Sequence, residues 1–362
     1  MGIFVLMAGG TGGHLFPAMA LAQELNRRGH EVHLATDERV EAYGGDFPAK
    51  KVHIIPAATP SLRNPVKFVG AGFTILRGVL VSLSMLGRVK PDAVIAFGGY
   101  PSFPPFLAAS LRGVPGMLHE QNAVMGRANR ALARFAKILA LQFEHTRGAE
   151  NFRGKKIITG NPVRDRVIEV AQTPYPPIGE NLVLKLLVFG GSQGARAFSD
   201  LVPPAVSNLP DPIRKRLLVT QQCRSEDMER VTAAYREARI NVELSTFFDD
   251  LPTRMAEAHL VVARAGASSI AELGVLGRPA ILVPLPGSLD QDQRANATVM
   301  ENAGGGWLMD EATLSPQLLG KRLAELLGDA KGLERAAAQA KTVGRADAVK
   351  RLADAAEALG TK

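Results

Sequence analysis

The chain has 362 residues, of which 46% are hydrophobic and 22% are charged, and its formal net charge is +8. This length suits two domains, and the composition is typical of a globular protein rather than of a disordered or fibrous one. Cys223 is the one cysteine, which excludes a disulfide framework and a cysteine metal cluster and favours a reducing compartment. We expect Cys223 to be a small apolar residue of the core.

The positive charge is concentrated in the first half of the chain. Residues 1–163 carry 19 Lys and Arg against 10 Asp and Glu, whereas residues 164–362 carry 24 against 25. A one-sided positive field attracts anionic partners such as membrane headgroups or an anionic substrate, although solubility alone also explains it. The sequence has no arginine-rich tract and no interleaving of aromatic and basic residues, so we expect no nucleic-acid partner.

The first half alternates apolar runs with helical patterns. This alternation predicts a parallel sheet with crossover helices. The first helix is expected to start near Pro17 and to end at Gly29, which puts His14 at the junction of loop and helix. The expected strands are residues 3–8, 32–36, 93–97, 117–119, 138–142 and 157–159.

A glycine-rich loop, residues 9–14, follows the first expected strand. Free N–H groups at the start of the next helix would attract phosphate or other oxygen-rich groups. The spacing is not G-x-G-x-x-G, and the Lys-Ser/Thr of a P-loop is missing, so a kinase or NTPase is disfavoured. A tight turn without any ligand gives the same pattern.

Residues 68–87 form a mostly apolar run interrupted by Arg77 and four glycines. A central charge costs about 2.5–3.5 kcal/mol in a membrane-spanning helix, so we reject a transmembrane helix. We also expect no export, because no basic stretch, apolar region and cleavage site follow one another at the N-terminus. The apolar helical face either packs on its own domain or contacts a membrane surface. That face consists of Phe73, Leu76, Val79, Leu80, Leu83 and Leu86.

The second half repeats the same scheme. Its glycine-rich loop, residues 190–194, follows an apolar run, and helix-length stretches separate the runs. A second doubly wound domain is therefore predicted, with the crossing between domains near Arg164. The expected strands are residues 186–189, 217–220, 242–244, 260–263 and 280–284, and residues 335–359 are expected to form terminal helices.

Several blocks of sequence, taken together and in this order, closely resemble the MurG family, the peptidoglycan N-acetylglucosaminyltransferases of bacteria. The resemblance implies a GT-B fold, in which two Rossmann-like doubly wound α/β domains face a central cleft. Residues 1–162 would bind the acceptor and the membrane, residues 163–342 would bind the UDP-sugar donor, and a helix in 343–362 would return to the first domain. The blocks are residues 9–14, 98–100, 119–122 with Gly126 and Asn129, 160–164, 190–196 and 264–267.

The implied activity is an inverting transfer of N-acetylglucosamine from UDP-N-acetylglucosamine to the muramyl 4-hydroxyl of lipid I, the undecaprenyl-pyrophosphoryl-muramyl-pentapeptide. The product would be lipid II for peptidoglycan synthesis. The resemblance also implies a peripheral protein on the cytoplasmic face of the inner membrane, with an anionic membrane surface and cell-wall synthesis proteins as partners. Other GT-B enzymes stay open as alternatives, namely a diacylglycerol glycosyltransferase or a UDP-sugar epimerase, as does a non-catalytic nucleotide-sugar-binding scaffold.

The resemblance also assigns roles to residues. His14 is the candidate general base, although a histidine that only caps the loop would look the same. His119 is expected to be structural. No cofactor or metal is expected, because Asp290-Gln291-Asp292 is interpreted as the start of a donor-facing segment rather than as a metal motif. The expected donor-binding residues are Thr11, Gly12, Gly13, Asn122, Arg164, Ser192, Phe248, Ala267, Ser268, Ser269, Glu272 and Gln293. The expected acceptor and phosphate-binding residues are Gly10, Gly98, Gly99 and Tyr100.

Overall fold

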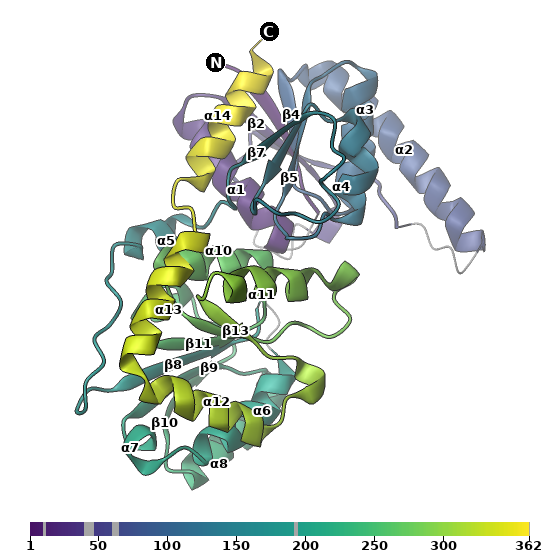
Figure 1. Ribbon diagram of the computed structural model, residues 1–362. Coiled ribbons are helices and arrows are strands. Elements are labelled where there is room, and N and C mark those ends of the chain that lie inside the picture. The colour runs from purple at the N-terminus through teal and green to yellow at the C-terminus, as the bar shows by residue number, and fades with distance from the viewer. Residues whose placement is uncertain (10–11, 40–46, 60–64, 192–194, 362) are drawn as a thin grey trace. The chain divides into compact units, whose positions relative to one another are not determined.

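The computed structural model describes residues 1–9, 12–39, 47–59, 65–191 and 195–361. The chain divides into two compact units, of which unit 1 comprises residues 1–164 and 347–362 and unit 2 comprises residues 165–346. Figure 1 draws the elements of both units along the chain.

Unit 1 contains a seven-stranded sheet in which every neighbouring pair of strands is parallel. Its strand order is β3-β2-β1-β4-β5-β6-β7. The central strands are buried on both faces, which explains why they are visible in the sequence as continuous apolar runs. The strands are β1 (Ile3–Met7), β2 (Glu31–Thr36), β3 (Lys51–Ile54), β4 (Ala93–Ala96), β5 (Gly116–Glu120), β6 (Ile138–Leu141) and β7 (Lys155–Ile158).

Helices cover both faces of this sheet. One apolar core joins the sheet to α1 (Gly12–Arg27) and α14 (Ala348–Gly360). The core of the other face includes residues of α2 (Pro65–Val89), α3 (Phe103–Leu111) and α4 (Arg127–Leu132). In Figure 1 the strands of unit 1 lie between these two sets of helices. The short 3₁₀ helices η2 (Tyr100–Ser102) and η3 (Ala133–Phe135) precede α3 and follow α4.

The first helix begins earlier than the sequence predicted. It starts at Gly12, and Pro17 lies inside it rather than at its first position. The expected start near Pro17 was therefore wrong, because residues 12–16 before the proline are already helical. As a consequence, His14 lies in the first turn of α1 rather than at the junction of loop and helix.

Unit 2 contains a six-stranded parallel sheet of order β10-β9-β8-β11-β12-β13. Its core includes Cys223, which is buried as predicted. The strands are β8 (Leu184–Phe189), β9 (Leu217–Gln222), β10 (Asn241–Ser245), β11 (Leu260–Ala263), β12 (Ala280–Leu282) and β13 (Gly306–Leu308). The helices are α5 (Asp165–Val170), α6 (Arg196–Ser207), α7 (Asp211–Arg214), α8 (Met228–Glu237), α9 (Leu251–Glu257), α10 (Ala267–Leu276), α11 (Asp292–Asn302), α12 (Pro316–Gly328) and α13 (Ala330–Val343), with 3₁₀ helices η4 (Ser225–Asp227), η5 (Leu289–Gln291) and η6 (Glu311–Thr313).

Both sheets are doubly wound, as the sequence predicted. In each of them the strand order reverses beside the first strand, between β1 and β4 in unit 1 and between β8 and β11 in unit 2. Ligands of open α/β sheets bind at the carboxyl ends of the strands near such a reversal. The carboxyl edges of the two sheets are therefore the places to look for a site.

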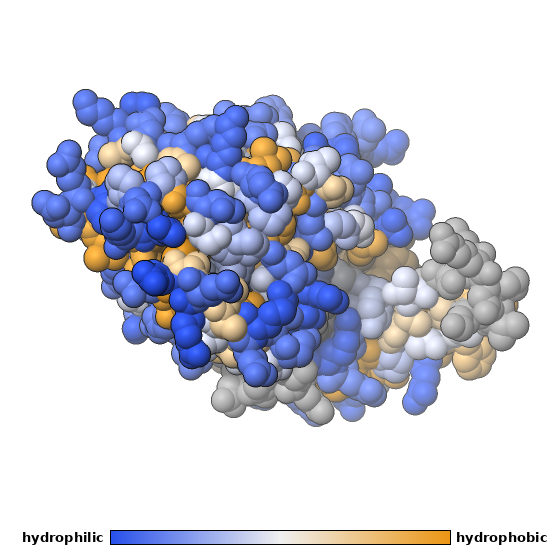
Figure 2. All heavy atoms as spheres, turned by 90° about the horizontal axis from the view of Figure 1, so that it is seen from below, coloured by the Kyte–Doolittle hydropathy of each residue, from blue (hydrophilic) through white to orange (hydrophobic). Residues whose placement is uncertain are grey.

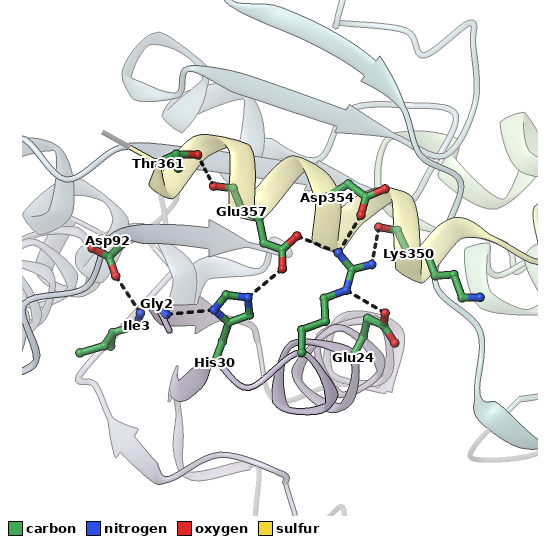
Figure 3. Close-up of polar contacts among 10 residues, drawn as sticks. Gly2, Ile3, Glu24, His30, Asp92, Lys350, Asp354, Glu357 and Thr361 are labelled. Carbon is green, nitrogen blue, oxygen red and sulfur yellow. Dashed lines mark hydrogen bonds and ion pairs between the residues drawn. The ribbon is translucent and has the colours of Figure 1, made fainter.

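The last helix, α14, is tied to unit 1 by charged side chains. Arg28 donates hydrogen bonds to Glu24 at 2.9 Å, to Asp354 at 2.7 Å and to Glu357 at 2.8 Å (Figure 3). The His30 Nε2 atom lies 2.7 Å from Glu357, and the hydrogen bonds from His30 and Arg28 lower the pKa of that carboxyl. The chain thus ends in the unit where it began.

Candidate active site

Two glycine turns meet at the carboxyl edge of the unit 1 sheet. The N–H of Gly9, after β1, donates a hydrogen bond of 3.1 Å to the carbonyl of Gly98, after β4. Gly98 and Gly99 have φ values of 97° and 76°, a left-handed region that favours glycine. A Cβ atom on Gly99 would lie 3.1 Å from the Gly9 Cα, so a side chain there would separate the turns.

The His14 ring packs against this pair of turns. Cβ atoms placed on Gly98 and Gly99 would each lie 3.3 Å from the ring, at its Cε1 and Cδ2 atoms. The structure therefore brings His14 together with Gly98 and Gly99, while Gly12 and Gly13 begin the helix that carries it. Gly10 and Thr11, which the sequence also assigned to this site, lie outside the described residues.

A buried histidine lies behind the same edge. The His119 Nε2 atom donates to the Gly160 carbonyl at 3.0 Å, and the Gln121 Nε2 atom is 3.0 Å from the His119 Nδ1 atom. Burial, with a smaller contribution from the neighbouring His14, lowers the pKa of His119 to about 4. His119 is therefore neutral near pH 7 and has the structural role that was expected of it.

Glu120 organises the loop that follows β5. Its carboxylate accepts the N–H groups of Asn122 at 3.0 Å and Gly126 at 2.9 Å, and the side-chain amide of Asn129 at 2.8 Å. Burial raises the pKa of Glu120. Asn129 is buried and ties α4 to β5. Asn122 is held at the edge of the sheet by the same carboxylate.

Tyr100 begins η2 directly after the glycine turn. Its hydroxyl donates a hydrogen bond of 3.1 Å to Asp37, the residue that follows β2, and burial raises the pKa of the Tyr100 hydroxyl. Arg39 also binds Asp37. Asp37 and Arg39 carried no sequence motif and were missed, although polar residues directly after an apolar strand are a usable signal.

The carboxyl edge of the unit 2 sheet is built around the start of α10. Gly266 precedes the helix, and Ala267, Ser268 and Ser269 form its first turn. Glu272 lies one turn further on and is buried. These residues come together as the sequence predicted, with backbone N–H groups at a helix start that suits oxygen-rich ligands.

Two further contacts fix this edge. The Arg264 guanidinium donates to the carbonyl of Val283 at 3.1 Å and pairs with Glu311 at 2.5 Å. The Asn296 side chain, on α11, donates to the Ala265 carbonyl at 3.0 Å. The buried Arg264 thus ties the end of β11 to the segment after β12, and Asn296 ties α11 to the loop after β11.

Gln293, Phe248, Arg164 and Ser192 were also predicted to bind the donor. The side chain of Gln293 accepts the Leu285 N–H at 2.9 Å, which fixes the loop before α11. Phe248 is buried, with the Arg254 guanidinium 4.5 Å from its ring centre. Arg164 is the last residue of the first segment of unit 1. Ser192 lies outside the described residues.

The apolar face of α2 is split between core and surface. Val79 and Leu86 are buried in the core beside α3, and Leu83 packs partly against it, so these three residues are not available for the membrane contact expected of them. Phe73, Leu76 and Leu80 are 76%, 54% and 60% exposed. The apolar face of α2 is wider than the surface that α3 covers, so the rest of that face is exposed. In Figure 2 pale and orange surface lies beside the grey atoms at the right, where α2 begins.

By length and composition alone, residues 68–89 of α2 could cross a membrane. One third of the apolar window is buried inside the protein, and Ser82 donates a hydrogen bond to Gly78 within the helix at a buried position. A Cβ atom on Gly78 would lie 2.1 Å from the Pro56 carbonyl oxygen. These close contacts make α2 a packed element of unit 1.

Known proteins resemble both halves of the chain. Residues 4–140 match the family model of the glycosyltransferase family 28 N-terminal domain, and residues 185–352 match that of the family 28 C-terminal domain. The UDP-N-acetylglucosamine–N-acetylmuramyl-(pentapeptide) pyrophosphoryl-undecaprenol N-acetylglucosamine transferase of Mesorhizobium japonicum is 51% identical over 363 residues, covering 100% of this chain and 96% of that protein. The enzyme of the same name from Brucella abortus is 49% identical over 361 residues, covering 99% and 95%.

Solved structures give the same picture. The crystal structure of Acinetobacter baumannii MurG has a TM-score of 0.81 and 29% identity, covering 98% of this chain and 99% of that one. The UDP-GlcNAc 2-epimerase of Neisseria meningitidis has a TM-score of 0.68 at 13% identity, covering 97% and 98%. At that low identity the epimerase shows a shared fold and nothing more.

Proposed function

This chain belongs to glycosyltransferase family 28, and we propose how its residues carry out the reaction of the relatives that it matches along its whole length. It is a UDP-N-acetylglucosamine-dependent N-acetylglucosaminyltransferase with the two α/β domains of the GT-B fold. It transfers N-acetylglucosamine to lipid I and forms lipid II for peptidoglycan synthesis. The observation that carries this conclusion is the 51% identity across the entire chain.

His14 acts as the general base. Its neutral imidazole takes the proton of the muramyl 4-hydroxyl while that oxygen bonds to the anomeric carbon and the bond to UDP breaks, so the configuration inverts. No protein nucleophile is needed, because a direct displacement forms the product in one step. The position of the ring against Gly98 and Gly99, at the carboxyl edge of the sheet, supports this role. The neutral state of His119 supports it as well, because a second positive charge beside His14 would resist its protonation.

The donor is held mainly by the second domain, residues 163–342. Backbone N–H groups at the start of α10 and near Ser192 bind oxygens of the nucleotide, and Arg164 provides a permanent cation as charge builds on departing UDP. Glu272 accepts ribose hydroxyls, Gln293 binds the sugar, and Phe248 marks the backbone segment that meets uracil. Thr11, Gly12, Gly13 and Asn122 complete the donor contacts, together with Ala267, Ser268 and Ser269.

The acceptor is held by the first domain, residues 1–162, with a helix in 343–362. Backbone groups of Gly98 and Gly99 bind the acceptor pyrophosphate, and Gly10 and Tyr100 are assigned to the same group of the acceptor. The +9 formal charge of residues 1–163 supports this assignment, because the acceptor is anionic.

A transfer assay tests the activity against its alternatives. Purified protein is incubated with radiolabelled UDP-N-acetylglucosamine and either a lipid I analogue or diacylglycerol, and the labelled products are separated. We expect label on the lipid I analogue alone. Label on diacylglycerol would support the other glycosyltransferase, a changed sugar on UDP would support an epimerase, and donor binding without any product would support a scaffold.

The protein binds the cytoplasmic face of the inner membrane as a peripheral protein, through the exposed residues Phe73, Leu76 and Leu80 of α2. Apolar side chains near a basic surface bind anionic bilayers by burial and by charge together. Other proteins of cell-wall synthesis would meet it at that surface.

Sedimentation with vesicles tests this contact. The wild type is expected to bind anionic phosphatidylglycerol vesicles more strongly than neutral phosphatidylcholine vesicles, and a triple variant with serine at the three positions should lose most of that binding. Leu318→Ser is the control, because Leu318 is exposed to a similar extent on α12 of unit 2. Equal binding of the triple variant and the control would remove the assignment.

A further inference from the structure

Three side chains form a polar cluster at the carboxyl edge of the unit 1 sheet, between the end of β2 and η2. The Asp37 Oδ2 atom accepts hydrogen bonds from the Arg39 Nε atom at 2.8 Å and from the Tyr100 hydroxyl at 3.1 Å. A second nitrogen of the same guanidinium lies 2.8 Å from Asp37 Oδ2, and the group stands 5.1 Å from the centre of the Tyr100 ring. One oxygen of Asp37 thus holds both neighbours in place.

The other oxygen of Asp37 is left without a partner. Asp37 is only 9% exposed, and its buried Oδ1 atom has no hydrogen bond among the described residues. Burying a polar atom without a hydrogen bond costs several kcal/mol, and native proteins leave few such atoms. The Asp37 Oδ1 atom therefore has an unused acceptor position, which a hydrogen-bond donor of a ligand can fill once the side chains that cover this atom move.

The cluster adjoins the glycine turn, Gly98 and Gly99, against which the His14 ring packs. Tyr100 follows Gly99, and the His14 ring packs against Gly99. Asp37 is therefore hydrogen-bonded to Tyr100, the residue that directly follows the turn at Gly98 and Gly99. The Arg39 side chain is 45% exposed, so part of its guanidinium can be reached by a ligand.

We propose that Asp37 and Arg39 recognise a neutral polar group of the acceptor that both donates and accepts hydrogen bonds, namely a sugar hydroxyl or a secondary amide. This inference rests on the proposed function. The Asp37 oxygen binds the N–H or O–H of the group, and Arg39 binds its oxygen. Because the pair has no net charge, an anionic group would gain little from Arg39 and would be repelled by Asp37. The subsite therefore selects the acceptor by hydrogen bonding, while the glycine turns bind its pyrophosphate.

Two parts of the acceptor offer this chemistry. The muramyl ring has hydroxyl and N-acetyl groups, and the pentapeptide has backbone amides. The two sources are separated by comparing a lipid I analogue that has the pentapeptide with one that lacks it.

The experiment measures steady-state transfer with Asp37→Asn and Arg39→Gln. We expect each variant to raise the KM of the pentapeptide analogue about 10- to 100-fold, the effect of losing a charge-assisted hydrogen bond, and to change the KM of UDP-N-acetylglucosamine less than about twofold. Tyr100→Phe should have a smaller effect of the same kind, because it removes only a contact to the other oxygen. The controls are Asp211→Asn and Arg214→Gln, which break a surface pair of the same residue types in α7.

The outcomes separate the inference from the proposed function. If the increase disappears with the analogue that lacks the pentapeptide, the subsite binds a peptide amide; if it persists, the subsite binds the sugar. An acceptor KM that changes no more than in the controls, or an increase in the donor KM instead, would overturn the inference while transfer itself stands. A wild type that glycosylates neither analogue would remove the proposed function and this inference with it. Arg39→Gln changes an exposed side chain, so it tests the subsite even if Asp37→Asn fails to fold.

Discussion

The carboxyl edges of the two sheets are similar in backbone and different in chemistry. The edge of unit 1 brings His14 close to the buried His119, with Glu120 next in the chain. The edge of unit 2 presents the start of α10, and its buried Arg264 is paired with Glu311. His259, the one histidine of residues 165–346, precedes β11 and so lies at the opposite edge of its sheet. The imidazole that we propose for proton transfer therefore belongs to unit 1, whereas the groups that we propose for donor binding lie mainly in unit 2.

Removing His14, the proposed base of unit 1, should have the largest effect. His14→Ala is expected to lower kcat about 10²- to 10⁴-fold, the usual contribution of a positioned general base, with little change in the KM of the donor. Initial rates at saturating substrates measure this. The control is His145→Ala, because His145 is exposed and belongs to the same unit. Undiminished turnover of His14→Ala would contradict the proposal that the edge of unit 1 supplies the base and the edge of unit 2 binds the donor.

The neutral state of His119 can be tested through stability. Its pKa is about 4 in the folded protein against about 6.5 when unfolded, so between these values the unfolded chain binds more protons. The contribution is fully present above pH 6.5 and is lost as the pH falls towards 4, by at most about 3 kcal/mol. Denaturant unfolding from pH 7.5 to 4.5 should show this loss in the wild type and a flatter dependence in His119→Gln. Parallel curves for the two proteins would mean that His119 is not held neutral.

A smaller change is expected at the edge of unit 2. Glu272→Gln should raise the KM of UDP-N-acetylglucosamine about tenfold and change kcat less, because it weakens hydrogen bonds to the ribose while the base in unit 1 is intact. Glu325→Gln is the control, since Glu325 is an exposed residue of α12. If Glu272→Gln lowered kcat alone, unit 2 would take part in the chemical step and the contrast between the edges would fail.

The sequence predicted the strands that are buried on both sides. The runs that became β1, β4, β8 and β11 are central in their sheets, and a strand covered on both faces must be apolar at every position. The edge strands β3 and β13 were missed. β3 is partly exposed along its length and β13 has only three residues, so little apolar pattern marks them, whereas the opposite edge strands β7 and β10 were predicted.

Contacts between distant segments were harder to foresee than glycine loops. The turn at Gly98 and Gly99 was visible because its positive φ values favour glycine. The pairing of Tyr100 with Asp37 joins residues 63 positions apart, and no local pattern encodes it. The same holds for α2, where α3 buries Val79 and leaves Leu76 and Leu80 exposed although all three share one apolar face. Tertiary packing decides such cases.

Removal of divalent metal ions by a chelator is expected to leave the transfer rate unchanged. This tests whether the donor diphosphate is bound without a metal. The triplet Asp290-Gln291-Asp292 looks like a motif for a metal and a diphosphate, yet the Asp292 Oδ1 atom accepts the N–H of Gln293 at 2.7 Å, so this carboxylate helps to start α11. Asp290 and Gln291, with φ values of 53° and 57°, form the tight turn before it. We therefore expect equal transfer rates with and without EDTA, and no gain on adding Mg²⁺ or Mn²⁺. A loss with EDTA that Mg²⁺ restores would mean that a metal, rather than Arg164 and backbone N–H groups, neutralises the departing diphosphate.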